Sequence, residues 1–130
     1  MNNYKRAIFL LTLFLCPSLA NHQQWRPIFI GDNFSYLLDD TSVQKYGYIL
    51  DATIGILTHL PIKIENFMAA SASYFIQANC INKSIAVKRG VLFNNPVDQS
   101  GLITYNAPKI FKMLISDTIE QQYLRALCMS

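Results

Sequence analysis

The chain has 130 residues, enough for one domain, and its 52% hydrophobic and 15% charged residues exclude an intrinsically disordered chain. The formal net charge is +3, from 11 basic and 8 acidic residues, and it falls to +1 without Lys5 and Arg6 of an N-terminal segment that we expect to be removed. A domain so close to neutral has no global field for nucleic acid, so we expect no nucleic-acid partner.

Residues 1–20 have the three parts of a secretory signal peptide. Two positive charges precede an uncharged apolar run of ten residues, Ala7 to Cys16, and Ser18 and Ala20 are the small residues that a signal peptidase requires. The rival interpretation is a membrane anchor, but ten residues rise only about 15 Å as a helix, half the thickness of a hydrocarbon core. We therefore expect a cleaved signal over 1–20 and one exported domain over 21–130, in the periplasm, on the outer-membrane surface or secreted.

Strand patterns dominate the first two thirds of the expected domain. Alternating apolar residues and turn clusters predict six strands, at residues 25–30, 34–38, 46–58, 72–80, 85–93 and 102–105. The longest of them, 46–58, has the clearest period of two, which predicts one buried face. Asp39–Ser42 predicts a turn, and 59–70, which contains Pro61, predicts a loop. Such close spacing favours antiparallel neighbours.

The period changes near the C-terminus. Four apolar residues recur at helical spacing on one face, namely Ile119, Tyr123, Leu124 and Leu127. Asp117 and Glu120 have the spacing of a capping box, and Ser116 is a competing N-cap. The fold class that follows is α+β, an antiparallel sheet of about six strands with a C-terminal helix.

Two cysteines, Cys80 and Cys128, remain after the expected signal cleavage. Two cysteines in an oxidising compartment usually pair, and closing a loop of about 49 residues is worth roughly 4 kcal/mol. A metal pair and a redox pair are the rival interpretations, which the absence of a CxxC spacing and of a nearby histidine disfavours. The bridge would pin the terminal helix to the end of the fourth strand.

No sequence pattern predicts catalysis. A Ser–His–Asp set could use His59, but no nucleophile-elbow sequence accompanies it, so we interpret His59 as a surface residue. The acidic residues lack the spacing of a cation-binding loop. We therefore expect no enzyme, no metal and no cofactor.

Basic residues gather at the fifth predicted strand, where Lys83, Lys88 and Arg89 lie on or beside it. Strand alternation would place Lys88 on the opposite face from Lys83 and Arg89. A local basic surface fits an acidic partner such as a glycosaminoglycan or a host protein. The rival explanation is edge protection, in which lysine prevents strand-to-strand aggregation.

Apolar residues also interrupt the less buried face of the predicted sheet, at Ile49, Leu57 and Phe75. A helix or a second subunit could cover them, or they could form a binding patch. Ordinary core packing is the alternative explanation for some of them.

The order of these features resembles a known family. The features are Trp25, the Tyr36–Asp40 strand end running into Thr41–Val43, a long strand, the Ser71-x-Ser73-x-Phe75 strand finishing at Cys80, and a helix closing on Cys128. This pattern is similar to the surface-adhesin protein E family of Gram-negative bacteria. The resemblance implies a sheet with a disulfide-linked helix, homodimers, and adhesion to host extracellular-matrix or serum proteins. The founding adhesin is lipid-anchored, whereas Leu15 before Cys16 is a poor lipidation match, so a periplasmic inhibitor or envelope accessory protein is the alternative.

Overall fold

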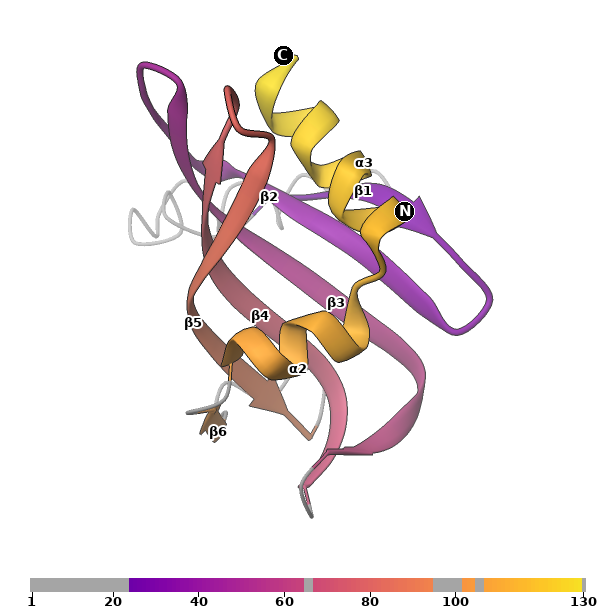
Figure 1. The fold of residues 1–130 in the computed structure, drawn as a ribbon. Helices are drawn as coiled ribbons and strands as arrows, with labels where there is room; N and C mark the ends of the chain where they lie inside the picture. Colours follow the sequence, from indigo (N-terminus) through magenta and orange to yellow (C-terminus); the bar gives the residue numbers. More distant parts are fainter. Residues whose placement is uncertain (1–23, 65–66, 95–101, 105–106, 130) are drawn as a thin grey trace, which may run out of the picture.

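The computed structural model describes residues 24–64, 67–94, 102–104 and 107–129, and the expected signal over 1–20 lies outside them. The described chain forms one antiparallel sheet and two helices (Figure 1). In order, the elements are β1 (Trp25–Ile30), β2 (Phe34–Tyr46), β3 (Ile49–Ile64), β4 (Phe67–Asn79), β5 (Ser84–Phe93), β6 (Leu102–Thr104), α2 (Ala107–Leu114) and α3 (Asp117–Cys128). The six strands pair in sequence order, which confirms the predicted meander.

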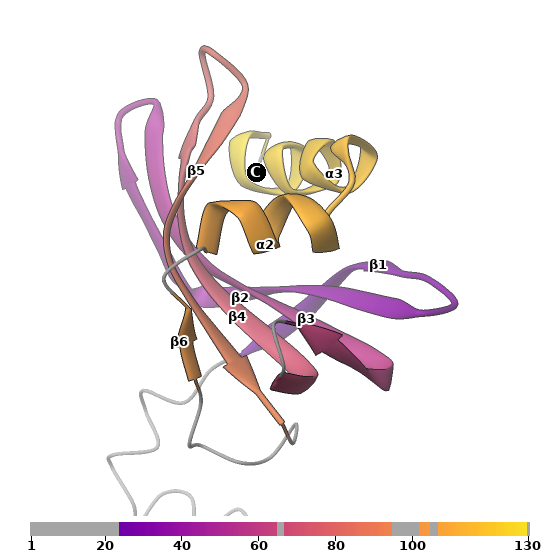
Figure 2. The same ribbon diagram turned by 60° about the horizontal axis from the view of Figure 1, so that its bottom comes forward.

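The sheet is curved, and both helices lie against the same side of it (Figure 2). We call this side the concave face and the opposite side the convex face. Alternate residues of β3 point to opposite faces. Leu50, Ala52 and Ile54 on the concave face are each at most 3% exposed, as the period of two over 46–58 predicts. Tyr46 and Tyr48, at the start of the same pattern, are exposed instead.

The core fills the space between the concave face and the helices. Its buried side chains include Leu38, Ile54, Ile56, Tyr74, Ile76 and Leu92 from the sheet and Ile110, Phe111, Ile119, Tyr123 and Leu127 from the helices. The ring of Tyr74 meets that of Phe111 edge-on, with centroids 5.4 Å apart. Burial of each such side chain contributes about 1.5–3 kcal/mol, so helix packing supplies much of the fold's stability.

Helix α3 is capped at its own start, and three contacts, two hydrogen bonds and one disulfide, hold it on the concave face. Its N-cap is Ser116, whose hydroxyl accepts a hydrogen bond from the N–H of Ile119 at 3.3 Å, so the competing cap is the one used. The hydroxyl of Tyr123 donates to the carbonyls of Leu37 (3.0 Å) and Gly55 (3.3 Å).

The third contact is covalent. Cys80, directly after β4, and Cys128, at the end of α3, form a disulfide with Cα atoms 5.6 Å apart. The predicted bridge between sheet and helix is therefore confirmed, and with it the fold class.

The expected turn at Asp39–Ser42 is wrong, because β2 continues through it. The pairing of β2 with β3 stops after Asp39 and resumes at Gln44, which leaves the residues between them as a bulge. The buried carboxylate of Asp39 holds this bulge by accepting hydrogen bonds from the N–H of Thr41 at 3.0 Å and from its hydroxyl at 2.6 Å. The polar residues that resemble a turn interrupt the ladder without ending the strand.

The expected loop over 59–70 is also wrong, because β3 covers its first half and β4 its second half. Pro61 lies inside β3, in the stretch between Leu57 and Ile62 where the β3–β4 register shifts. Proline is tolerated at such a bulge because the missing N–H is not needed by the ladder.

Helix α2 is an element that our sequence analysis did not predict. Its eight residues include Ile110, Phe111 and Leu114, which are buried, and Lys109 and Lys112, which are exposed. The hydroxyl of Tyr36 donates to the carbonyl of Leu114 at 2.8 Å and ties the end of the helix to β2.

Candidate functional site: the convex face and the β5 edge

Three exposed apolar side chains lie on the convex face: Trp25, Leu57 and Phe75, with exposed fractions of 37%, 36% and 38%. We call them the convex patch. The register places Leu57 and Gly55 on the same face of β3, and a Cβ on Gly55 would lie 3.0 Å from Cζ3 of Trp25. The indole therefore rests directly on the backbone of Gly55, between the other two side chains along the sheet.

Both described helices lie on the other side of the sheet (Figure 2), so neither covers the convex patch. Leu57 and Phe75 thus lie on the less buried face where the alternation places them, and Ile49 on the same face is half-buried. Trp25 is a patch residue that the sequence analysis did not identify. The signal that could have identified it is Gly55 on β3, whose missing side chain leaves room for the indole to reach across β2 from β1.

The three basic residues take different positions around β5. Lys83 precedes the strand in a left-handed turn conformation, with φ of 55°. Arg89 pairs with Phe75 across the sheet and so lies on the convex face beside the convex patch. The register shifts next to that pair, because Val87 pairs with Ile76, and Lys88 is the extra residue.

This bulge makes the prediction that Lys83 and Arg89 share a face of the fifth strand wrong. Simple alternation would keep Ile85, Val87 and Arg89 on one face, whereas the extra residue lets Val87 and Gly90 both face the core side. Arg89 is thereby turned to the convex face, and Lys83 faces α3. The basic residues therefore bracket the first half of β5 and do not form one flat cluster.

The first half of β5 is also a free sheet edge in the described part of the chain. Strand β6 pairs only with the stretch Gly90–Leu92, so Ser84–Val87 has β4 on one side and no described strand on the other. Backbone N–H and C=O groups at such an edge are available to another extended chain. We call Ser84–Val87 the open edge.

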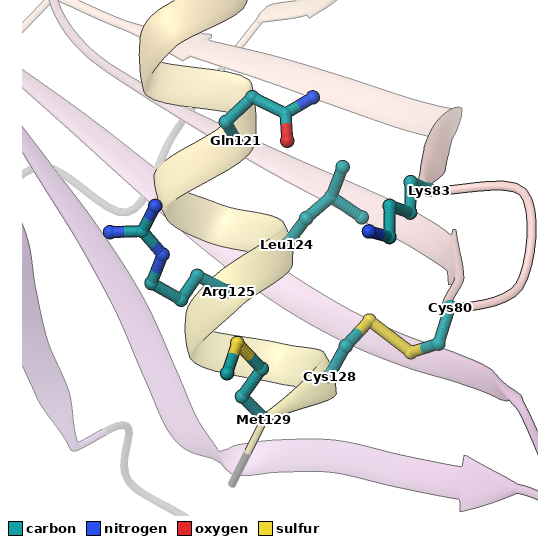
Figure 3. A pocket seen from close by; sticks show the side chains of 7 residues that line it. All are labelled: Cys80, Lys83, Gln121, Leu124, Arg125, Cys128 and Met129. Carbon is teal, nitrogen blue, oxygen red and sulfur yellow. A yellow bond between two sulfur atoms is a disulfide. The ribbon is translucent and has the colours of Figure 1, made fainter.

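A pocket of about 200 Å³ lies beside the start of the open edge, between the β4–β5 turn and α3 (Figure 3). Its lining consists of Cys80, Lys83, Gln121, Leu124, Arg125, Cys128 and Met129. The Lys83 side chain points toward α3, and the disulfide closes one end of the pocket (Figure 3). Two cationic residues and no carboxylate belong to the lining, and the Lys83 ammonium is the charge that points toward this space, so it suits an acidic group. The Arg125 guanidinium points to the other side of α3 (Figure 3) and complements the negative end of the helix dipole.

A second, more open pocket of about 410 Å³ lies between the β1–β2 turn and the start of α3. Aromatic rings of Phe29, Phe34 and Tyr36 contribute to its wall, with centroids of neighbouring rings 6.0–6.4 Å apart. Its polar lining includes Asp32 and Thr118, and no cationic residue belongs to the lining. Its chemistry therefore differs from that of the pocket beside the disulfide.

His59 lies within β3, and its Nε2 is 3.2 Å from the hydroxyl of Ser35 at an exposed position. In the described residues no carboxylate forms a hydrogen bond to the ring.

An ion pair lies at the other edge of the sheet. The guanidinium of Arg26 contacts the carboxylate of Asp40 at 2.9 Å, and this hydrogen bond raises the pKa of Arg26. Both side chains are nearly half exposed, so the pair contributes at most about 1 kcal/mol. Its position, at the bulge of β2, fits the protection of an edge strand.

Comparison with protein-family models, with curated proteins and with solved structures finds no match. Within the described ranges, no group of three or more histidine, cysteine or acidic side chains is placed to hold a metal ion. None of the described helices is long and apolar enough to span a bilayer.

Proposed function

We propose that this protein is an exported, non-enzymatic binding module of the surface-adhesin E type, which attaches to a host extracellular-matrix or serum protein. The observation that carries the proposal is the convex patch. Trp25, Leu57 and Phe75 form an apolar centre, and Arg89 lies next to it as the cross-strand neighbour of Phe75. Aromatic residues and arginine are the residues most enriched at the centres of protein interfaces.

A protein partner fits this surface better than a small molecule does. The patch lies on an open sheet face, whereas small-molecule sites are concave and enclose most of the ligand. The helices already occupy the concave face and give the sheet a rigid backing, so the convex side chains are held in place before binding. Such preorganisation reduces the entropy that association costs.

The test is a binding screen of the purified protein against a panel of extracellular-matrix and serum proteins. The double substitution Leu57→Ser/Phe75→Ser should weaken binding of any partner at least tenfold. The matched control Ile81→Ser/Met113→Ser removes two even more exposed apolar side chains away from the patch and should leave binding within twofold. Equal loss in both variants, or no binding by the unmodified protein, contradicts the proposal.

The alternative is a periplasmic inhibitor or envelope accessory protein, which the poor lipidation match at Leu15-Cys16 favours. Protease treatment of intact cells separates the two functions. A surface-displayed adhesin is digested under this treatment, whereas a periplasmic protein survives until the outer membrane is opened.

A further inference from the structure

We propose that the open edge of β5 takes up an extended acidic segment of a partner protein by strand addition, with one acidic side chain entering the pocket beside Lys83. The inference deepens the proposed binding function and rests on it, but it uses a surface other than the convex patch.

The backbone of the open edge suits strand addition. Four residues without a bulge, Ser84–Val87, span about 13 Å and have a strand partner on one side only among the described residues. An incoming strand would extend the ladder of β4 and β5. At the opposite edge of the sheet, Pro27 and the register shift of β1 interrupt the ladder. The open edge is therefore the more receptive of the two.

The charge around the open edge favours an acidic partner segment. The stretch 67–93, which contains β4 and β5, has three cations and no acidic residue, whereas the rest of 21–130 has six basic and eight acidic residues. The cations stand at both ends of the open edge, Lys83 before it and Lys88 and Arg89 after it. A second copy pairing antiparallel here would bring Lys83 of one copy near Lys88 of the other. This repulsion disfavours the second copy and favours an acidic strand.

The pocket defines one end of the interaction. It begins at Lys83, next to the first residue of the open edge, and reaches Arg125 on α3. A carboxylate in this space of about 200 Å³ would lie beside the Lys83 ammonium, because the Lys83 side chain points toward it, whereas the Arg125 guanidinium points to the other side of α3 (Figure 3). Because Lys83 faces α3 and Arg89 faces the convex side, the two acidic side chains of the partner should point to opposite faces of its strand.

The probe is the labelled peptide acetyl-Glu-Val-Thr-Val-Thr-Glu-amide, whose terminal glutamates lie an odd number of residues apart. We expect it to bind the purified protein in low salt and to lose affinity as salt is added. A peptide N-methylated at each residue keeps the charges but cannot donate to a ladder, and it should bind at least tenfold more weakly. A peptide with lysine in place of both glutamates should not bind.

Matched variants locate the site. Lys88→Gln/Arg89→Gln should weaken peptide binding at least tenfold, whereas Lys63→Gln/Lys109→Gln, with the same change in net charge, should change it less than twofold. Lys83→Asn should also weaken binding, and asparagine tolerates the left-handed backbone at this position. Melting temperatures of all three variants should match that of the unmodified protein within a few degrees.

Amide hydrogen exchange distinguishes strand addition from simple charge attraction. Bound peptide should slow the exchange of those amides in Ser84–Val87 that exchange rapidly in the free protein. Binding without this protection, or equal binding of the N-methylated peptide, overturns the proposal. Concentration-dependent dimers that protect the same amides without peptide would instead identify a second copy as the occupant. Peptide binding that survives Leu57→Ser/Phe75→Ser while host proteins fail to bind would support the edge and refute the adhesin function.

Discussion

The two faces of the sheet are built from alternate residues of the same strands, yet their surroundings differ. On β3, Ile54 is fully buried on the concave face, and Leu57, three residues later, is 36% exposed on the convex face. Helices and a disulfide seal the concave face, whereas the convex face keeps its aromatic side chains in solvent. A strand with apolar residues on both faces is therefore not always buried on both faces.

Loss of the disulfide should have the largest effect on this contrast. The double substitution Cys80→Ser/Cys128→Ser should lower the free energy of unfolding by about 2–5 kcal/mol, because it frees the unfolded chain and unties α3. Hydrogen exchange should show α3 opening before the sheet, which would partly uncover the concave face. An unchanged melting temperature and unchanged protection of α3 would contradict this expectation.

Truncation of single apolar residues should separate the faces directly. Ile54→Ala should cost about 2–5 kcal/mol, since it leaves a cavity against the helices. Leu57→Ala on the same strand should cost about 0.5 kcal/mol or less, because solvent already reaches that side chain. Chemical denaturation of both variants measures the difference. Equal costs would mean that the convex face is packed as tightly as the concave face.

Two buried tyrosines, Tyr74 on β4 and Tyr123 on α3, should respond to loss of the hydroxyl with opposite changes in stability. Tyr123→Phe removes the donor to the carbonyls of Leu37 and Gly55 and should destabilise the protein by about 1 kcal/mol. The buried hydroxyl of Tyr74 has no hydrogen-bond partner in the described structure, so Tyr74→Phe should stabilise it by about 1 kcal/mol. The same measurement on both variants tests whether hydrogen bonding or packing dominates at the helix interface.

The concave face should also respond to alkaline pH. Burial raises the pKa of Tyr36, Tyr74 and Tyr123 above the ordinary value of 10.0. Above about pH 10 the unfolded chain releases these protons while the folded chain retains them, so the free energy of unfolding falls as the pH rises. Melting temperatures measured from pH 8 to pH 11 should therefore decline, and Tyr74→Phe should make the decline shallower. A melting temperature that stays constant from pH 8 to pH 11 would contradict this expectation.

Much of the fold was predictable because its strongest patterns are local. The alternation around Ile54 marks a strand, and the two cysteines outside the expected signal over 1–20 leave one pairing. Bulges could not be predicted from local patterns, because the register shift at Pro61 depends on the neighbouring strand and not on the residues around the proline. Helix α2 has a helical apolar pattern of its own, but its eight residues are too few to stand out beside adjacent strands.

The candidate sites were less predictable for the same reason. Lys83, Lys88 and Arg89 stand out in the sequence, but their directions depend on one extra residue in β5. The convex patch needs a contact between Trp25 and Gly55, which lie on strands that are not neighbours in the sheet order. Sequence alternation assigns residues to faces, whereas three-dimensional neighbours decide which of them form a surface.

The position of Trp25 has a practical consequence. It is the single tryptophan of the chain, and its indole rests on Gly55 at the convex face. Its intrinsic fluorescence therefore offers an optical reporter that needs no label. A ligand that covers the convex face should shift the emission toward the blue, whereas a ligand at the far edge of the sheet should leave the spectrum unchanged.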